Sequence, residues 1–397
     1  MQASCLQENL AKGLSIISRA VATRPTLPVL SHVLLSTEQS QIKLAATDLE
    51  LFIVCWIGAK VEQPGATTVP ARLLTDLVNS LPPERIDLRL TDQTLHLSCA
   101  RNEVDIKGID AQEFPLIPTV ESDASGGVPE TSLDPELLRQ MISQVVFAAA
   151  TDESRPILTG VLTRFEEDNL TMATADGFRL SVRSAQLPAP APQSISAVIP
   201  AKALSELARI GANEEKPISM YITPSRSQVL FHLQGSTSAD EGSRSSTSVF
   251  GIDLVSQLIE GNFPNYQQIV PKSHTTRTIL NTEEFLKACR TANIFARSEA
   301  NVIHISVEPG AELSMGRVEI TASSAEMGDS VIDLDASVEG EPVTIAFNAR
   351  FLMDALSVMD SAQVALETST SSSPGMLKPL GSEDFVHVIM PMHIRPR

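Results

Sequence analysis

The sequence has few aromatic residues, few cysteines and no long hydrophobic run. Aromatic residues make up 4% of the 397 residues, and the single tryptophan, Trp56, is expected in a core or a sheet. Cys5, Cys55, Cys99 and Cys289 form no CxxC pair, which argues against a cysteine metal site and indicates reduced thiols of a cytoplasmic protein. No apolar stretch is long enough to span a membrane, and no basic segment followed by an apolar run opens the chain. We therefore expect a soluble, cytoplasmic protein.

Familiar catalytic signatures are absent as well. The seven histidines show neither HExxH nor HxH spacing, and no GxSxG, P-loop or GxGxxG motif occurs. The acidic run in "FEEDNL", Glu166 to Asp168, lies between two strand patterns and is most simply a hairpin turn. Asp48 and Asp176 occupy equivalent positions of an internal repeat, which favours a turn role over catalysis. We expect no enzyme, cofactor or metal, with a β-rich hydrolase left as an alternative.

Basic residues are outnumbered by acidic ones, 30 to 48, and the net charge is −18 at pH 7. Such a chain is a poor phosphate binder as a whole, because phosphate contacts need Lys and Arg. The segments with helical periodicity nevertheless carry a slightly positive total, so the acidic excess lies in the rest of the chain. We expect a mildly basic helical surface within an acidic body, against which a duplex could lie without a tight phosphate grip.

A helix followed by a strand occurs three times. Over residues 6–24, aliphatic residues recur every three or four positions, and after Pro25 the stretch "PVLSHVLLST" alternates like a strand. Similar helices are predicted near 133, with Asp134 as cap and Pro135 in the first turn, and near 280, with Asn281 or Thr282 as cap.

A second helix recurs in step with the first. In three stretches a short strand leads into a helix that begins with Ala followed by a basic residue. They are "TVPARLLTDLVNSL", "AVIPAKALSELARI" and "TIAFNARFLMDALSVM". In these stretches Arg72, Lys202 and Arg350 correspond, and Asp48 in "LAATDLEL" corresponds to Asp176 in "MATADGFRL". The landmarks repeat at intervals of 128 to 148 residues, so the chain is predicted to be three copies of one α+β unit.

Polar segments mark the expected joints between the copies. Residues 121–130 form a Gly/Pro-containing linker, and residues 271–278 form a second one. We accordingly place three domains at 1–124, 129–271 and 272–397. The polar stretch 234–248 is expected to be a mobile hairpin loop inside the second domain.

The chain ends on "HVIMPMHIRPR". Met390 and Met392 are two residues apart, so on a strand they would share one face. This pattern is compatible with a last core strand and with a contact surface, and the terminal residues alone do not decide between them.

Six segments together resemble the bacterial DNA sliding clamp, the beta subunit of DNA polymerase III. They are "RPTLPVL" at 24–30, "TDLEL" at 47–51, "RPILTGV" at 155–161, "ADGFRL" at 175–180, "GNFPNYQQIVP" at 261–271 and "VIMPMHI" at 388–394. They occur in the family's order from end to end. The resemblance implies an α+β chain of three similar clamp domains and a head-to-tail homodimer. That dimer would close a six-domain ring with helices lining the hole and sheets outside.

The resemblance also implies a function and partners. The family member is a noncatalytic processivity factor that encircles duplex DNA, slides along it and tethers the replicative polymerase. The implied partners are double-stranded DNA without sequence preference, the DNA polymerase III catalytic subunit, the clamp loader, other replication and repair proteins with clamp-binding peptides, and a second copy of the chain. The implied location is the bacterial cytoplasm, at the nucleoid. From the residues alone, a repeat-built scaffold without a DNA role stays open as an alternative.

A docking site for partner peptides is implied between the second and third domains. Methionines suit such a site, because a flexible thioether repacks around different side chains. Ala175, Gln268 and His393 depart from the commoner family pattern, so we expect an altered rim. The matching positions are Leu158, Ala175, Gly177, Phe178, Arg179, Leu180, Pro264, Gln268, Ile269, Asn348, Ser373, Val388, Met390, Pro391, Met392 and His393.

The residues expected to face DNA are basic and lie on or beside predicted helices. Each could equally be a solvated surface charge. They are Arg24, which is the best candidate, and Lys12, Arg72, Lys202 and Arg209.

A dimer seam is expected between an edge-like strand of the first domain and a helix of the third. On the strand we place Val104 and Ile106, and on the helix Ile294 and Phe295. Core packing is the alternative for all four side chains.

Overall fold

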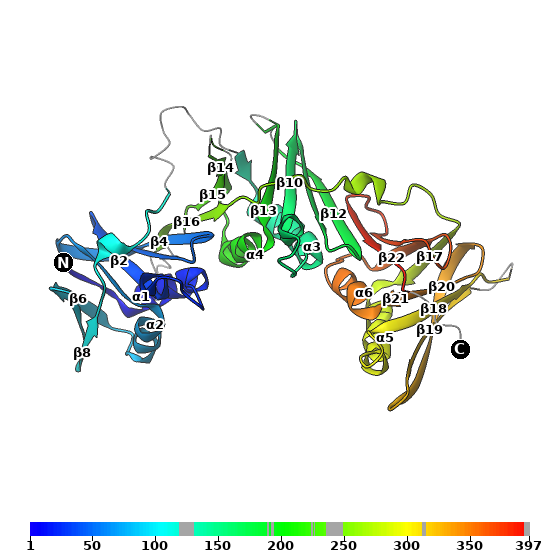
Figure 1. Cartoon of the computed structure of the whole chain (residues 1–397), viewed down its shortest axis with the longest axis horizontal. Coiled ribbons are helices and arrows are strands. Elements are labelled where there is room, and N and C mark those ends of the chain that lie inside the picture. The colour runs from blue at the N-terminus through cyan, green and yellow to red at the C-terminus, as the bar shows by residue number, and fades with distance from the viewer. Residues whose placement is uncertain are drawn as a thin grey trace, which may run out of the picture. The chain divides into compact units, whose positions relative to one another are not determined.

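The computed structural model describes residues 1–118, 131–188, 190–191, 194–223, 225, 227–235, 249–311 and 315–392. It divides into two compact units (Figure 1). The first unit comprises Met1–Arg139 and Lys202–Leu258, and the second comprises Gln140–Ala201 and Ile259–Arg397. The predicted linker at 121–130 and residues 236–248 of the predicted loop lie outside the described residues.

The first unit is built on a twelve-stranded antiparallel sheet. Its main path runs β8-β7-β6-β1-β4-β16-β15-β14-β9, and β2, β3 and β5 branch from it. The strands are β1 (Gln2–Leu6), β2 (His32–Glu38), β3 (Gln41–Thr47), β4 (Leu51–Gln63), β5 (Ala66–Pro70), β6 (Arg85–Thr91), β7 (Thr94–Cys99), β8 (Asn102–Lys107), β9 (Thr131–Leu133), β14 (Ile218–Ile222), β15 (Gln228–Leu233) and β16 (Val249–Gln257).

The helices of the first unit are 10 or 11 residues long. They are α1 (Gln7–Ile17), α2 (Ala71–Ser80) and α4 (Ala201–Ile210), with short 3-10 turns η1 (Ser18–Ala20), η2 (Pro28–Ser31), η3 (Ala111–Glu113) and η7 (Gly211–Asn213).

The helix predicted over 6–24 was too long, and the strand predicted from residue 28 begins later. After η1 the chain turns back, and the Ala22 N–H donates to the Leu30 carbonyl at 3.1 Å. Pro28 opens the turn η2, so β2 starts only at His32. Arg24 therefore lies in an exposed bend rather than at a helix end.

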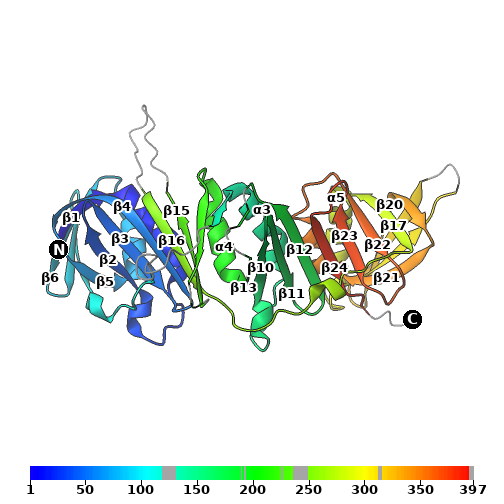
Figure 2. The ribbon, with the colours of Figure 1, turned by 90° about the horizontal axis from the view of Figure 1, so that it is seen from above.

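The second unit also holds a twelve-stranded antiparallel sheet, in the order β13-β10-β11-β12-β24-β23-β22-β17-β20-β19-β18-β21 (Figure 2). Its strands are β10 (Gly160–Glu166), β11 (Asn169–Ala175), β12 (Arg179–Gln186), β13 (Ile195–Pro200), β17 (Thr276–Asn281), β18 (Val302–Glu308), β19 (Gly316–Ser324), β20 (Gly328–Gly340), β21 (Val343–Asn348), β22 (Gln363–Thr368), β23 (Gly375–Pro379) and β24 (Phe385–Ile389).

Helices α5 (Thr282–Ala296) and α6 (Ala349–Leu356) pack on this second sheet, with Phe285, Phe347 and Leu352 fully buried between them and the strands. The helix α3 (Pro135–Val145) runs across the division between the units, and the remaining turns are η5 (Val146–Ala148), η6 (Pro156–Thr159) and η8 (Tyr266–Gln268).

The predicted helix caps are confirmed. The Asp134 carboxylate accepts a hydrogen bond from the Leu137 N–H at 2.8 Å, and α3 begins at Pro135. At α5 the cap is Asn281, whose side chain accepts from the Glu284 N–H at 3.0 Å. Each cap satisfies one backbone donor that the first helical turn leaves unpaired.

The turn role predicted for Asp48 and Asp176 is confirmed, and the two turns match. The Asp48 Oδ1 accepts from the N–H groups two and three residues on, at 3.1 and 2.8 Å. The Asp176 Oδ1 accepts from the equivalent N–H groups at 2.8 and 3.0 Å. The residue after each aspartate has a positive φ, +80° at Leu49 and +93° at Gly177. Equivalent turns in two copies support the internal repeat.

The cysteines are buried and unpaired with one another. Burial raises the pKa of the Cys5 and Cys55 thiols to about 12, so both are kept as neutral thiols at neutral pH. No helix in the described part of the chain is both long and apolar enough to cross a membrane. The same residues place no three His, Cys, Asp or Glu side chains where they could share a metal ion.

Candidate functional site

The predicted docking residues gather where β12 and β24 lie side by side in the second unit (Figure 2). Leu180 is paired with Val388, and Val388 is paired in turn with Met376 on β23. Paired residues of neighbouring strands project from the same face of a sheet, so these three apolar side chains form one cross-strand row.

A second apolar row runs parallel to the first. It passes from Val198 through Leu162, Ala173 and Val182 to Val386, each paired with the next. The two rows form one apolar cluster, which the segment after Leu258 partly covers. The buried members of this cluster are Leu162, Ala173, Ala175, Leu180, Val198, Tyr266, Met376 and Val388, and Ile157, Val182, Ile259, Phe263, Val270 and Val386 pack against it.

Three large apolar side chains near this cluster remain exposed. Phe178 is 59% exposed, Ile269 is 41% exposed and Met390 is 39% exposed. Pro264 and Gln268, which precede Ile269, are exposed as well. Exposed apolar side chains grouped beside a buried apolar cluster are typical of a surface that contacts a partner.

The terminal methionines lie beyond the last strand, so the prediction that they share a strand face is wrong. Strand β24 ends at Ile389, and the Met390 N–H donates to the Phe178 carbonyl at 2.8 Å. The Met392 N–H donates to the Ala346 carbonyl, also at 2.8 Å. Pro391 between them has no N–H to satisfy. His393, predicted at the rim, lies outside the described residues.

Gly177 packs against the Arg155 side chain, and Leu158 is fixed by a backbone hydrogen bond. At φ +93°, a Cβ added to Gly177 would lie 2.9 Å from the Arg155 Nη1. The Arg155 Nη2 in turn donates to the Asp176 carbonyl at 3.1 Å. Leu158 is 7% exposed in η6, and its carbonyl accepts from the Ala150 N–H at 2.9 Å. The positive φ therefore favours glycine in the turn before β12, although Leu49 takes the equivalent position in the first copy.

Arg179, one of the predicted docking residues, is bonded to several groups within the chain. Its side chain is 10% exposed, and its Nη1 donates to the Asp354 carboxylate on α6 at 2.6 Å. Its Nε donates to Asp176 at 2.9 Å and its Nη2 to the Phe147 carbonyl at 2.7 Å. The guanidinium also lies 4.4 Å from the centroid of the Phe351 ring. Strand alternation puts this side chain on the helix side of the sheet, opposite Leu180, where it ties β12 to α6.

His387 lies on the same helix side of the sheet. It is fully buried, its Nδ1 shares a hydrogen bond of 2.6 Å with the Ser181 hydroxyl, and its ring lies 5.3 Å from that of Phe147. Burial first, and the nearby positive charge of Arg179 second, lower the pKa of His387 to about 3. The imidazole is therefore neutral at physiological pH.

Asn348 and Ser373, which were also predicted for docking, have clear local roles. The Asn348 side chain accepts from the Arg350 N–H at 3.0 Å and so caps α6. The Ser373 hydroxyl shares a hydrogen bond of 2.7 Å with the Thr370 hydroxyl in the turn that precedes β23. Sequence reasoning missed Met376 and Tyr266, because their place in the cluster depends on strand pairing rather than on a local pattern.

The basic residues proposed to contact DNA differ in how closely they approach acidic side chains of the same chain. Lys202 at the start of α4 forms an ion pair with Asp48, and the Arg209 Nε donates to the Glu206 carboxylate at 2.7 Å. Arg72 is 96% exposed and lies 3.9 Å from Asp76, which is a loose surface pair. Lys12 on α1 is half-buried, and Arg24 is exposed.

The four side chains proposed for the dimer seam differ in how exposed they are. Ile294 on α5 is 53% exposed, whereas Phe295 is half-buried against the core around α5 and α6. Strand β8 ends the sheet path of the first unit, and its Val104 is half-buried. Ile106 is only 1% exposed, so its side chain belongs to the core and cannot reach a second copy. Core packing, the alternative considered for Ile106, is correct.

Strand β20 offers another edge that the sequence did not reveal. Strand β17 pairs only with residues 337–340 of β20, so residues 328–336 have one edge without a partner strand among the described residues. Val331 on this half is 62% exposed, and Met327 in the preceding turn is 51% exposed. A free strand edge beside exposed apolar side chains is a ready template for pairing with another chain.

Known proteins of one family match this sequence from end to end. Three family models match in succession: the N-terminal domain of the DNA polymerase III beta subunit at residues 1–118, the central domain at 132–265 and the C-terminal domain at 267–393. The beta sliding clamp of Synechococcus elongatus is 31% identical over 401 residues, with 100% of each chain covered. The beta sliding clamp of Bacillus subtilis is 29% identical over 403 residues, with 99% of each chain covered.

Solved structures match as well. The DNA polymerase sliding clamp of Bacillus subtilis superposes with a TM-score of 0.87 at 27% identity, and 100% of each chain is covered. Neither the hydrolase nor the scaffold alternative is supported by these matches, and the ring dimer is the assembly that the family implies. The chain belongs to the DNA polymerase III beta subunit family, with the three-domain α+β fold and the noncatalytic processivity role of a beta sliding clamp.

Proposed function

We propose that this clamp recruits its partners through the apolar cluster of the second unit and the exposed Phe178, Ile269 and Met390 beside it. The observation that carries the proposal is that these three large side chains stay exposed next to a buried apolar cluster. The occupant is a short apolar peptide of a partner protein. The partners are the polymerase III catalytic subunit, the clamp loader, and replication and repair proteins that carry such a peptide.

Weak binding suits this role. A peptide of a few residues buries little area, so we expect a Kd on the order of micromolar. Met390 and Met392 can repack around different peptide side chains, because a thioether is unbranched and polarizable. A ring of two chains offers two such surfaces, which allows partners to exchange or to be held together.

The docking surface is tested by replacing Met392, which is half-buried, with Asp. We expect Met392→Asp to abolish binding of a fluorescent apolar partner peptide in an anisotropy titration, because a carboxylate would have to be desolvated. The matched control is Met315→Asp, since Met315 is 66% exposed and lies outside the cluster. The dimer should persist in both variants. Normal peptide affinity in Met392→Asp would return this residue to a purely structural role.

We also propose that the ring holds DNA by topology rather than by tight phosphate contacts. The net charge of −18 opposes strong binding of DNA to the surface at large, and basic residues such as Arg24 and Arg72 would supply weak contacts. Clamps loaded on nicked circular DNA should remain bound, and cutting the circle should release them. Equal retention on circular and linear DNA would rule out topological holding.

The domain boundaries that we propose are 1–124, 129–271 and 272–397, so that each copy of the repeat forms one domain. We propose that the clamp acts in the bacterial cytoplasm, at the nucleoid, where its DNA and polymerase partners are.

A further inference from the structure

The first cross-strand row of the docking cluster continues beyond Met376 into charged residues. Met376 on β23 is paired with Glu367 on β22, and Glu367 is paired in turn with Arg277 on β17. On the same strands, Leu366 and Leu280 belong to the core that also contains residues of α5 and α6. Because the side chains of a strand alternate between its two faces, the charged pair lies on the opposite face, which carries Met376.

Glu367 lies beneath three basic side chains. The Lys378 Nζ is 3.2 Å, the His274 Nδ1 3.4 Å and the Arg277 Nε 3.7 Å from its carboxylate. The Glu367 side chain is 6% exposed, whereas those of the three basic residues are 28% to 38% exposed. The three basic side chains, which we call the basic cluster, therefore cover the carboxylate and form the surface. Even with histidine neutral, two positive charges stand against one negative charge.

Arg277 has hydrogen-bond donors that the rest of the chain does not use. Its Nε is buried, and it has no hydrogen-bond partner among the described residues. The Glu367 carboxylate, at 3.7 Å, is beyond hydrogen-bond distance. Glu339, the strand neighbour of Arg277 on β20, forms no ion pair with it in the part of the chain that the structure describes. Buried donors normally have a partner, so an acceptor brought by another molecule would complete this site.

The basic cluster lies in the interior of the sheet and not at an edge. Strands β23, β22 and β17 have neighbours on both sides, in the order β24-β23-β22-β17-β20. The residues of β20 that lack a partner strand among the described residues are 328–336, whereas Arg277 is paired with Glu339. The cluster is therefore separate from the strand edges that a second copy of the chain could extend.

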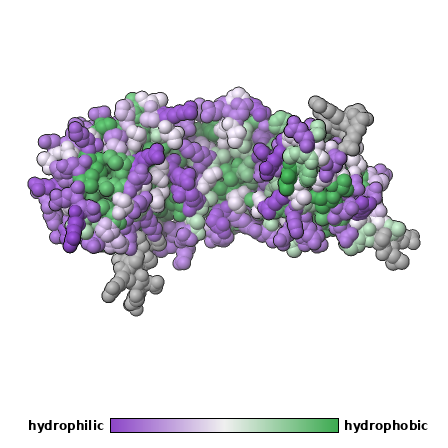
Figure 3. Space-filling model, turned by 90° about the horizontal axis from the view of Figure 1, so that it is seen from below, coloured by the Kyte–Doolittle hydropathy of each residue, from purple (hydrophilic) through white to green (hydrophobic). Residues whose placement is uncertain are grey.

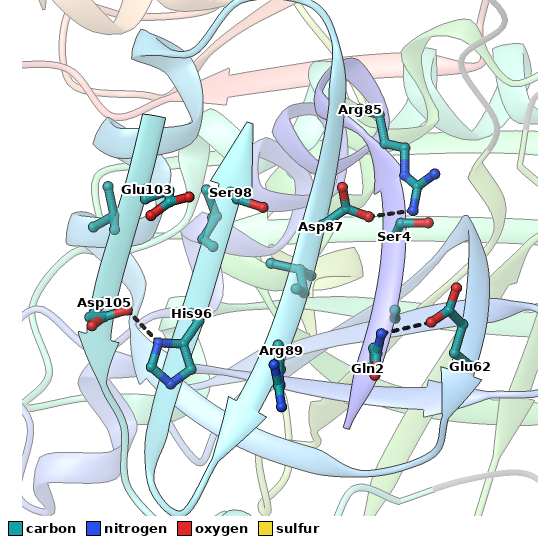
Figure 4. A pocket seen from close by; sticks show the side chains of 14 residues that line it. Gln2, Ser4, Glu62, Arg85, Asp87, Arg89, His96, Ser98, Glu103 and Asp105 are labelled. Carbon is teal, nitrogen blue, oxygen red and sulfur yellow. Dashed lines mark hydrogen bonds and ion pairs between the residues drawn. The ribbon is translucent and has the colours of Figure 1, made fainter. Parts of the chain in front are cut away.

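A charged hollow on the sheet of the first unit is built differently (Figure 4). There, Asp87 meets Arg85 and Asp105 meets His96. The side chains of these two carboxylates are 52% and 67% exposed, so both signs of charge reach the surface. In the second unit, the burial of the single carboxylate is what makes the surface of the cluster basic.

The basic cluster and the docking residues are close enough for one peptide to reach both. His274 follows the exposed Ile269 by five residues, so their Cα atoms are at most about 18 Å apart. Arg277 lies two strands from Met376, which is about 10 Å at the usual spacing of strands. An extended peptide advances about 3.3 Å per residue, so this second distance corresponds to about three residues.

We propose that the basic cluster binds a carboxylate of the partner peptide, about three residues from the peptide's apolar side chains. This inference rests on the proposed docking of an apolar peptide and adds the chemistry of its flank. Arg277 can hold a carboxylate through two parallel N–H groups, and Lys378 adds a point charge. The net charge of −18 repels acidic peptides from the chain at large, so the cluster selects peptides whose acidic residue lies at the right spacing.

Two labelled octapeptides test this site in anisotropy titrations with the full-length clamp. The acidic probe is Glu-Ser-Ser-Leu-Phe-Ser-Ser-Glu, which places a carboxylate on either side of an apolar pair, so the direction of the bound peptide does not matter. The neutral probe replaces both glutamates with glutamine and keeps the shape. We expect the acidic probe to bind about three- to fivefold more tightly than the neutral probe at low salt, and the ratio to shrink as salt rises.

Two variants should move this ratio in opposite directions. Lys378→Gln removes one positive charge and should lower the ratio to about twofold or less. Glu367→Gln removes the carboxylate that neutralises the cluster and should raise the ratio above that of the unaltered clamp, which a purely structural role of Glu367 would not do. The control is Lys287→Gln, the same change at an exposed lysine of α5, whose helix packs on the other face of the sheet. It should leave the ratio unchanged.

Equal affinity of the two probes would overturn the proposal and leave the apolar docking surface standing, because the neutral probe still binds. Absence of binding by both probes would contradict the docking surface itself, and this inference with it. An equal fall of the ratio in Lys378→Gln and Lys287→Gln would indicate a general effect of charge and would also overturn the proposal. So would an unchanged ratio in Lys378→Gln together with reduced retention on nicked circular DNA, which would assign the basic cluster to DNA.

Discussion

At the residue scale, the single side chain of Arg179 connects three elements of the second unit. Its guanidinium joins β12 to α6 through Asp354 and to η5 through the Phe147 carbonyl, and it lies over the Phe351 ring. With 10% of the side chain exposed, water cannot replace these partners if the arginine is removed. The residue therefore ties the sheet of the second unit to helix α6.

Replacing Arg179 with Ala should lower the free energy of unfolding by about 3 kcal/mol or more, because the partners lose a largely buried charge. The matched control is Arg164→Ala, whose pair with Glu166 is 3.5 Å long and partly exposed. That variant should lose about 1 kcal/mol or less. Urea unfolding of the two variants measures both losses, and similar small losses would contradict the structural role.

His387 should make the clamp sensitive to acid. Its pKa is about 3 in the folded state, below the ordinary value of 6.5, so the unfolded chain binds more protons between these values. Stability from the neutral imidazole is thus complete above about pH 6.5 and is lost as pH falls toward 3, by at most about 1.4 kcal/mol per pH unit. His387→Gln should flatten the fall in the free energy of unfolding over this range. An unchanged slope between pH 6 and pH 4 would show that other groups govern acid unfolding.

At the scale of the element, the turn between β11 and β12 decides the position of Phe178. Asp176 ties down the two N–H groups that follow Gly177, and Arg155 packs against that glycine. A side chain at residue 177 would therefore have to displace the Arg155 guanidinium, and the turn presents Phe178 beside Met390.

Gly177→Ala should destabilise the second unit and weaken peptide binding, since the added Cβ is both strained and 2.9 Å from Arg155. Gly381→Ala isolates the strain, because Gly381 also has a positive φ, +87°, but nothing lies within 4 Å of its added Cβ. We expect a loss of about 1 kcal/mol in Gly381→Ala and a larger loss in Gly177→Ala. Thermal unfolding and a peptide titration compare them. Peptide affinity as good in Gly177→Ala as in Gly381→Ala would show that the turn does not shape the docking surface.

At the scale of the whole molecule, the family implies a ring of two chains, and such a ring needs two different complementary surfaces on each copy. The end strand β8, and the edge of β20 at residues 328–336 that has no partner strand among the described residues, are strand edges that a second copy could extend. Ile294 on α5 adds an exposed apolar side chain. Figure 3 shows hydrophilic and hydrophobic side chains interspersed on one face of the molecule.

Ile294→Asp should convert the dimer to monomers and abolish retention on nicked circular DNA, because a charge would be buried in the seam. Leu116→Asp is the control, as Leu116 is 95% exposed and is not assigned to the seam. Analytical ultracentrifugation gives the mass of each variant. A dimer of normal affinity in Ile294→Asp would remove α5 from the proposed seam.

Local sequence determined the features that depend on neighbouring residues. Periodicity predicted the existence of α1, α3 and α5, the caps Asp134 and Asn281 follow from side-chain chemistry, and spaced landmarks revealed the repeat. The family-specific segments are local too, so they were sufficient for the family and its fold. The end of α1 was missed because the chain turns back to bond with Leu30, which is a tertiary event.

Only the tertiary structure decided which side chains share a surface. Arg179 and Leu180 are adjacent in sequence, yet they project from opposite faces of β12, and Met376 joins the apolar cluster through β23 and β24. Ile106 was assigned to the seam until its burial showed that it belongs to the core. The physical reason is register: the pairing of β12 with β24 joins segments far apart in the chain, and a slip of one residue would reverse every face.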